Sequence, residues 1–131
     1  MQVPLLTDAL LNGCDDSFID HASLERPVHS ALVPAWHQLV AAARTAGFDP
    51  VIASGFRSYQ RQLTIWNDKA AGTRAVLDAS GQPQDVTALD DWQLVQAILR
   101  WSALPGASRH HWGTDIDVYD RAAVDQSYAV Q

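Results

Sequence analysis

The sequence contains a single cysteine, Cys14, so an internal disulfide framework is excluded. It also has no apolar run that approaches the roughly 20 residues of a membrane-spanning helix. Basic residues are scarce, since nine Lys and Arg against fifteen Asp and Glu give a formal net charge of −6. Because phosphate binding depends on Lys and Arg, this balance argues against nucleic acid or an anionic membrane as a partner. No internal repeat and no low-complexity segment is present.

The residues that are present indicate a folded domain. Of the 131 residues, 47% are hydrophobic and five are tryptophan, which provides enough apolar material for a core. We expect one domain over 1–131, with most of the tryptophans in its core. An irregular segment should cover 1–25, with a turn at Asn12-Gly13, and an excursion loop rich in Gly, Pro and polar residues should cover 71–86.

The spacing of apolar residues predicts three helices. The first ends near Ala46, and Pro34 either begins its regular part or kinks it. The second follows Ser58, whose side chain can cap it. The third follows Thr87 as a cap and ends at Pro105-Gly106.

Two short segments predict strands. Residues 50–54, PVIAS, form a short apolar run typical of a buried strand, and residues 114–119 alternate between two faces. The pattern therefore indicates an α+β fold, with two or three helices packed against a small, mainly antiparallel sheet. We expect the strands near 50–54 and 113–119 to be neighbours.

The stretch SRHHWGTDID, residues 108–117, concentrates the residue types that bind metals. A strand would place Asp115 and Asp117 on one face, about 7 Å apart. His110 lies in the preceding turn, and Gly113 permits a sharp bend between them. Imidazole and carboxylate are both zinc ligands, so His110 and Asp117 could converge on a cation. The alternative from spacing alone is a solvated turn followed by an exposed strand edge.

Two motifs carry a resemblance to a known family. Ser108-x-His110-x-x-Gly113-x-Asp115-x-Asp117 resembles the S-x-H-x-x-G-x-A-x-D signature of the zinc D-alanyl-D-alanine carboxypeptidases and dipeptidases. These include the vancomycin-resistance D,D-peptidases and share a fold with the hedgehog signalling domain. Upstream, residues 54–62 resemble the family's S-G-Y-R-S-x-x-x-Q. The resemblance covers roughly residues 28–120.

The resemblance implies a role for each matching residue. His110 and Asp117 match zinc ligands, so Zn²⁺ is the implied cofactor and a peptidoglycan peptide is the implied substrate. Arg57 matches the arginine that polarises the scissile carbonyl and stabilises its oxyanion. Ser108 matches the serine that contacts the terminal carboxylate of the substrate, and Gln62 would lie near that pocket.

Each of these roles has a structural alternative. Arg57 could simply pair with Asp115 or another carboxylate, Ser108 could only cap a turn, and Gln62 could be an ordinary helix residue. Trp112 could form a wall of the substrate site. We expect His111 to be a surface residue or a support for the ligands, and the remaining histidines to be surface or packing residues: His21, His29 and His37.

The chain departs from the family pattern at two points. Asp115 replaces the small alanine of the signature, where it could bind a substrate ammonium or anchor Arg57. The family also has a later E-x-x-H or E-x-W-H segment, which supplies the general base and a third zinc ligand. The only glutamate here is Glu25, and residues 118–131, VYDRAAVDQSYAVQ, contain neither glutamate nor histidine.

These departures lead us to expect that the chain is the N-terminal portion of a longer zinc D,D- or L,D-carboxypeptidase and is inactive alone. The alternatives are a non-catalytic metal- or peptide-binding derivative, and a structural fragment with a vestigial site. A homo-oligomer could supply the missing contacts. Residues 1–16 have no basic region, and Asp8 interrupts their apolar stretch, so we expect no signal peptide. The compartment stays open between cytoplasm, periplasm and cell envelope.

Overall fold

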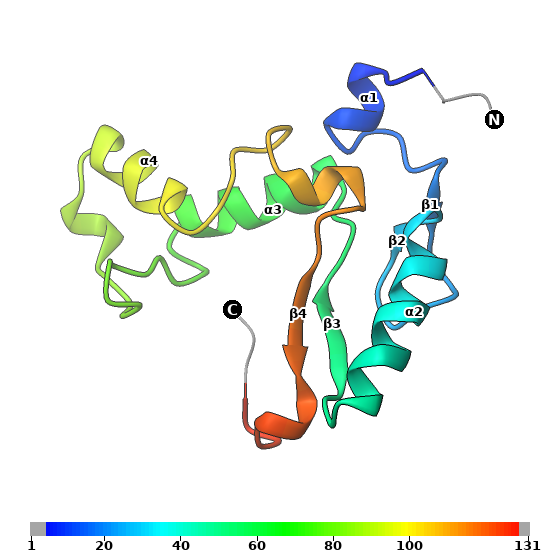
Figure 1. Cartoon of the computed structure of the whole chain (residues 1–131). Helices are drawn as coiled ribbons and strands as arrows, with labels where there is room; N and C mark the ends of the chain where they lie inside the picture. Colours follow the sequence, from blue (N-terminus) through cyan, green and yellow to red (C-terminus); the bar gives the residue numbers. More distant parts are fainter. Residues whose placement is uncertain (1–4, 129–131) are drawn as a thin grey trace.

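An antiparallel pair of strands, β3 (Pro50–Ser54) and β4 (Asp117–Asp120), lies at the centre of the computed structural model, which describes residues 5–128 (Figure 1). Ile52 pairs with Val118, and a bulge separates that pair from Ser54 and Asp117. The predicted strand at 50–54 and its predicted neighbour are confirmed. The second strand begins later than expected, because Ser54 is the last residue of β3 and leaves residues before 117 without a strand partner.

Helix α2 (Leu32–Thr45) covers one side of this strand pair. Its buried Trp36 packs with Ile52 of β3 and with Val28 of a second small antiparallel pair, β1 (Ile19–Asp20) and β2 (Val28–His29). Pro34 lies in the first turn of α2, where a missing amide hydrogen costs no helical hydrogen bond. Pro34 therefore begins the helix and does not kink it.

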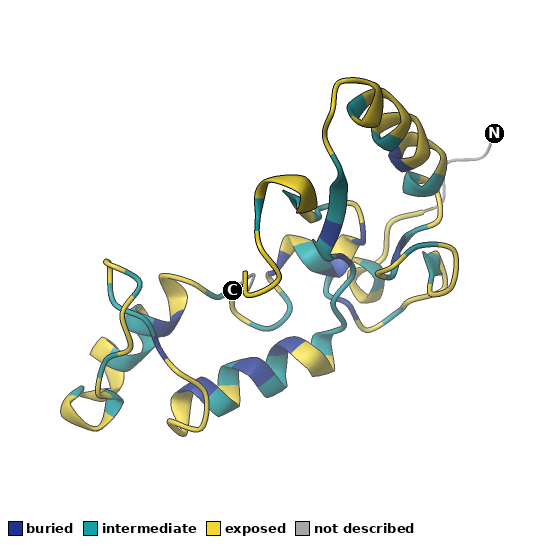
Figure 2. Ribbon diagram, turned by 90° about the horizontal axis from the view of Figure 1, so that it is seen from below, coloured by how far each residue is buried: buried dark blue, intermediate teal, exposed yellow. Residues whose placement is uncertain are grey.

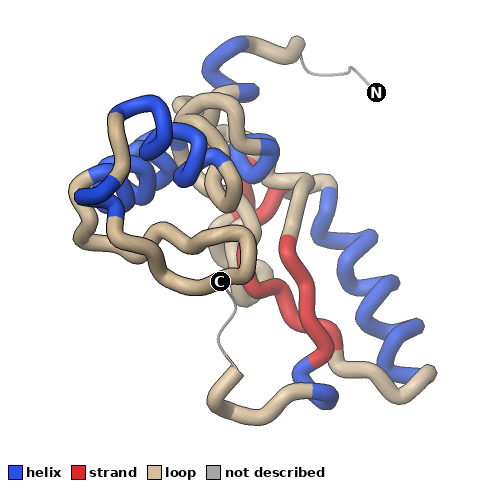
Figure 3. The backbone as a smooth tube through the Cα atoms, turned by 90° about the vertical axis from the view of Figure 1, so that its left-hand side faces the viewer, coloured by secondary structure: helices blue, strands red, loops and turns tan. Residues whose placement is uncertain are grey.

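Helices α3 (Tyr59–Ala70) and α4 (Asp91–Leu99) lie on the other side of the β3–β4 pair (Figures 1 and 3). The Ser58 side chain caps α3 as predicted, since its Oγ accepts a hydrogen bond from the Arg61 amide over 3.1 Å. Between α3 and α4 the chain is mostly irregular, with one isolated bridge between Leu77 and Pro83.

The start of α4 differs from the sequence expectation. Thr87 lies in a short 3-10 turn, Val86–Ala88, and the cap of α4 is Asp90. The Asp90 carboxylate accepts the Gln93 amide over 2.8 Å, and the Gln93 side chain accepts the Asp90 amide over 3.0 Å. This reciprocal capping box satisfies two free amides at once, so it prevails over a single threonine cap. The helix ends at Leu99, before Pro105 is reached.

Both helical layers bury only a narrow stripe of side chains (Figure 2). Helix α1 (Asp8–Leu11) is a single turn, and the predicted turn at Asn12-Gly13 follows it. The expectation that tryptophans lie mostly in the core is wrong. Trp36 is buried, whereas three tryptophans have large exposed surfaces: Trp92, Trp101 and Trp112. Within residues 5–128, no helix combines the length and the apolar character needed to cross a bilayer.

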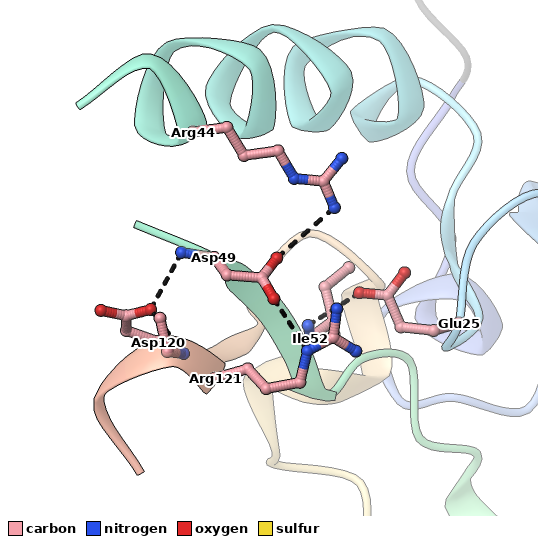
Figure 4. A network of polar contacts seen from close by, with 7 residues as sticks. Glu25, Arg44, Asp49, Ile52, Asp120 and Arg121 are labelled. Carbon is pink, nitrogen blue, oxygen red and sulfur yellow. Dashed lines mark hydrogen bonds and ion pairs between the residues drawn. The ribbon is translucent and has the colours of Figure 1, made fainter. Parts of the chain in front are cut away.

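A polar network ties the far end of the strand pair to α2 (Figure 4). The Asp49 carboxylate accepts Arg121 Nε over 2.8 Å and Arg44 Nη2 over 3.4 Å. The Asp49 amide donates to Asp120 Oδ1 over 2.9 Å. The hydrogen bond from Arg121 is the main reason that the pKa of Asp49 is lowered, so this carboxylate stays charged at neutral pH.

The only glutamate of the sequence, Glu25, takes part in holding the fold together. Glu25 Oε1 accepts the amide of Ile52 over 2.9 Å, at the edge of β3 (Figure 4). Its carboxylate therefore supports the strand pair. The α+β class with small antiparallel sheets is confirmed, although the strands form two separate pairs in the described residues.

Candidate metal and peptide-binding site

His110 and Asp117 come together as the sequence predicts. His110 Nε2 lies 3.3 Å from Asp117 Oδ2, and His110 Nδ1 lies 3.0 Å from the Gly55 carbonyl oxygen. A carbonyl can only accept, so Nδ1 donates to Gly55, and Nε2 is the ring nitrogen that faces Asp117. Metal-ligating histidines usually have this arrangement, with the second ring nitrogen donating to a carbonyl or carboxylate.

The separation of these two atoms also suits zinc. Ligands at about 2.1 Å from a tetrahedral zinc lie about 3.4 Å from one another. The 3.3 Å between His110 Nε2 and Asp117 Oδ2 matches this distance between two ligands. The two residues therefore fit two positions of a zinc site. Within residues 5–128, no group of three or more His, Cys, Asp or Glu side chains is placed to hold a metal, so a third ligand is not supplied there.

A 3-10 turn, Arg109–Trp112, presents the histidine. Ser108 caps this turn, because its Oγ accepts the His110 amide over 3.3 Å. Gly113 ends the turn with φ of +73°, a conformation that favours glycine. An added Cβ at Gly113 would lie 2.8 Å from the His29 amide nitrogen and 2.5 Å from Ile19 Cδ1. Backbone geometry and close packing therefore both demand glycine at this motif position.

Arg57 points its guanidinium into the same region and is held by neutral partners. Its Nη1 donates to Gln62 Oε1 over 3.0 Å, and its Nη2 donates to Ser54 Oγ over 3.2 Å. Burial lowers the pKa of Arg57, while the negative charge of Asp117 acts in the opposite direction. The pKa of arginine ordinarily lies far above neutral pH, so the side chain remains a positive charge.

The main chain of Arg57 joins the two motifs. Its amide donates to the His110 carbonyl over 3.0 Å, and its own carbonyl accepts His111 Nδ1 over 2.6 Å. His111 Nε2 in turn accepts the Gly106 amide over 3.0 Å. Burial lowers the pKa of His111, which keeps the ring neutral with this proton arrangement. His111 is only 1% exposed, so it is an interior link and not a surface residue.

A cavity of about 460 Å³ lies in front of these residues. Both motifs line it, through Arg57, Ser108, His110, Asp115 and Asp117. The motif residues therefore share one space, as a common site requires. Arg109 of the 3-10 turn also lines it, together with four residues from elsewhere in the chain that have polar groups and were not anticipated from the sequence: Lys69, Arg74, Trp101 and Ser102. They belong to the end of α3 and to segments after each helix, so no local motif marks them.

Gln62 lies beside the cavity and hydrogen-bonds two residues that line it, Arg57 and Ala103. It is fully buried and does not line the cavity. Its Oε1 holds Arg57, and its Nε2 donates to the Ala103 carbonyl over 2.7 Å. Both ends of the amide are thus occupied, so Gln62 positions Arg57 and does not face a ligand directly.

The other two substrate-site candidates also have specific partners. Asp115 Oδ2 lies 2.8 Å from Arg109 Nε, so Asp115 pairs with Arg109 and not with Arg57. Trp112 does not wall this cavity. It lines a separate apolar groove with residues of the N-terminal segment, including Leu10 and Phe18. His110 and Trp112 are two positions apart in a 3-10 turn with three residues per turn, so their side chains leave the turn in different directions.

Comparison with known proteins agrees with this arrangement. A family model described as VanY, D-alanyl-D-alanine carboxypeptidase, matches residues 25–130. The chain belongs to the VanY D-alanyl-D-alanine carboxypeptidase family. An uncharacterised protein of Haemophilus influenzae is 50% identical over 72 residues, which cover 55% of this chain and 49% of that protein. The VanY-family chain thus spans about half the length of this curated relative.

Two solved VanY-family structures have a similar fold. A VanY D,D-pentapeptidase variant in complex with Zn(II) superimposes with a TM-score of 0.59 at 24% identity, covering 82% of this chain and 56% of the other. VanYB in complex with D-alanine-D-alanine gives a TM-score of 0.57 at 26% identity, covering 79% of this chain and 51% of the other. The first of these two proteins is thus seen with zinc and the second with D-alanine-D-alanine.

Proposed function

We propose that this chain provides the zinc-binding and oxyanion-stabilising part of a D,D- or L,D-carboxypeptidase site that acts on peptidoglycan peptides. The observation that carries the proposal is the 3.3 Å approach of His110 Nε2 to Asp117 Oδ2, with His110 Nδ1 bonded to Gly55. A surface ion pair would not require the second ring nitrogen to be fixed. Family membership and the D-Ala-D-Ala complex of VanYB support the substrate class.

Each residue of the site would have a separate role. His110 and Asp117 would hold Zn²⁺, which supplies Lewis acidity and lowers the pKa of water when bound. Arg57 lies in the same cavity, where its fixed charge would stabilise the oxygen of the scissile carbonyl as negative charge develops. Ser108 would contact the terminal carboxylate of the peptide, since it lines the cavity while capping the turn.

Hydrolysis also needs a general base, and the carboxylates that line the cavity already have partners. Glu25 bonds to the amide of Ile52, and Asp115 pairs with Arg109. Asp115 and Asp117 are the carboxylates that line the cavity within the described residues. General-base catalysis typically contributes a factor of about 10² to 10⁴. We infer that the 131-residue chain alone binds D-Ala-D-Ala peptides but releases D-alanine very slowly.

Zinc titration of the metal-free chain by calorimetry tests the metal site. We expect 1:1 binding that weakens at least tenfold in His110→Ala and in Asp117→Asn. His37→Ala is the matched control, because His37 is exposed on α2, outside the cavity. Binding that is unchanged in both site variants would remove His110 and Asp117 from the metal site.

Release of D-alanine from an acetylated peptide ending in D-Ala-D-Ala, with zinc added, tests the catalytic inference. We expect a rate close to that of zinc without protein. Rapid turnover that is lost in Asp115→Asn would contradict the inference and identify Asp115 as the base.

A metal- and peptide-binding role without catalysis is the second candidate. It is favoured by one observation, that no third metal ligand accompanies His110 and Asp117 within residues 5–128. The candidates differ in one outcome: when a segment that supplies a base and a third ligand is added, the carboxypeptidase part releases D-alanine, whereas a purely binding protein does not.

A further inference from the structure

The cavity contains a buried cation that the proposed chemistry does not use. Lys69 is the only lysine of the chain and is 8% exposed. Its Nζ donates to Ser102 Oγ over 2.6 Å, and none of the ion pairs between described residues includes it. Burial lowers the pKa of Lys69, and the nearby Arg74 and Arg57 add to this effect. A buried ammonium without a carboxylate partner is costly, so it calls for a partner that binds from outside.

The charges around Lys69 favour an anion. Arg57, Lys69 and Arg74 line the cavity, while the two lining aspartates already face His110 and Arg109. This excess of positive charge is opposite in sign to the net charge of −6 for the whole chain. A cavity with one sign of charge and low-dielectric walls concentrates ligands of the other sign.

The position of Lys69 along α3 indicates which carboxylate fits. Gln62 and Lys69 both lie on the buried face of α3, and Gln62 holds Arg57. Seven residues of helix separate their backbones by about 10 Å. A carboxypeptidase substrate has one residue beyond the scissile bond, and that residue extends the chain by only about 3.8 Å. A peptide that places its scissile carbonyl at Arg57 therefore brings its terminal carboxylate near Arg57 and not near Lys69.

A carboxylate upstream of the scissile bond matches the separation of about 10 Å between these two positions of α3. Three residues of extended peptide, at about 3.3 Å each, span about 10 Å. We propose that Lys69 and Ser102 form a subsite for a second carboxylate of the peptide, carried by a residue two or three positions to the amino side of the scissile bond. This inference rests on the proposed peptidase function and specifies its substrate class as peptides with an upstream acidic residue.

Calorimetry with two matched peptides tests the subsite in metal-free protein. Acetyl-Glu-Ala-D-Ala-D-Ala and acetyl-Gln-Ala-D-Ala-D-Ala differ in one charge, at the third residue before the scissile bond. We expect the Glu peptide to bind about tenfold more tightly, since a charge-assisted hydrogen bond contributes at least that factor. Lys69→Met should abolish the preference, and Lys69→Arg should retain part of it.

Arg61→Met is the control for the loss of one positive charge, because Arg61 is exposed on the same helix and does not line the cavity. It should keep the full preference. Equal binding of the two peptides by the unmodified chain would overturn the subsite. A preference that persists in Lys69→Met would assign it to another residue and overturn the subsite as well.

A second measurement uses a variant only to assign the signal. Reductive methylation with ¹³C-formaldehyde labels Lys69 and the N-terminal amine, and Lys69→Arg identifies the side-chain signal. The Glu peptide should shift that signal and the Gln peptide should not; an identical response to both would count against the subsite. If zinc titration fails while the Glu preference holds, the proposed zinc function fails and the subsite stands. If zinc binds as expected and the two peptides bind alike, the subsite fails and the proposed zinc function stands.

Discussion

Replacing Gln62 by leucine should destabilise the fold and release Arg57. Gln62 is 0% exposed, and its amide both accepts from Arg57 Nη1 and donates to the Ala103 carbonyl. Leucine has a similar volume but makes neither bond. Each buried group left without a partner costs about 1–3 kcal/mol, and the added apolar contact returns about 1 kcal/mol. We expect a net loss of about 1–5 kcal/mol for the two groups together, which is large against the 5–15 kcal/mol typical of small domains.

Urea denaturation followed by tryptophan fluorescence measures this loss. Gln60→Leu is the matched control, because Gln60 is exposed on the same helix and should change the free energy of unfolding by less than about 0.5 kcal/mol. The folded fraction of Gln62→Leu should bind zinc with unchanged affinity but bind D-Ala-D-Ala peptides more weakly, since Arg57 loses its orientation. If the two variants are equally stable, the hydrogen bonds of Gln62 contribute nothing and the reasoning is refuted.

Two further changes probe the packing and the charge of the framework. In Gly55→Ala the new Cβ would overlap the Pro27 carbonyl oxygen, a backbone atom that cannot move aside, so we expect a loss of several kcal/mol. Gly47→Ala meets no neighbouring atom and should lose only about 1 kcal/mol from its positive φ, so comparable losses in thermal denaturation would contradict the packing argument. Asp49→Asn should lower the melting temperature at pH 7, because its pKa is held below the usual range by Arg121. The folded state therefore favours the charged form, and this contribution disappears as the pH falls below about 4, where melting curves of the two proteins should converge.

Local signals in the sequence were sufficient for the framework of the site. The apolar run 50–54 is bounded by proline and glycine, and it forms β3 with those bounds. Ser58 caps α3 because its hydroxyl oxygen can accept a hydrogen bond from a free amide of the first helical turn. The approach of His110 to Asp117 followed from the spacing of a turn and a strand, both of which have a fixed geometry.

Contacts between distant segments could not be read from the sequence. Lys69 and Ser102 are 33 positions apart, and no periodicity links the end of one helix to the loop after another. The burial of His111 depends on Gly106 and on the main chain of Arg57, which lies 54 positions away. The sequence does contain the signal for the start of α4, since Asp90 and Gln93 have the spacing of a capping box. The prediction of a cap at Thr87 was wrong because it considered a single residue and not this pair.

The two hydrogen bonds that join the motifs at residue 57 do not depend on its side chain. Residue 57 attaches to consecutive histidines through its amide and its carbonyl, which every amino acid except proline provides in full. A lineage could therefore exchange the arginine, lose whatever reaction depends on its charge, and keep the imidazole of His110 in place. Proteins of this fold that bind ligands without catalysis would then have the same backbone as those that catalyse. Only the residue at position 57 would distinguish the two groups.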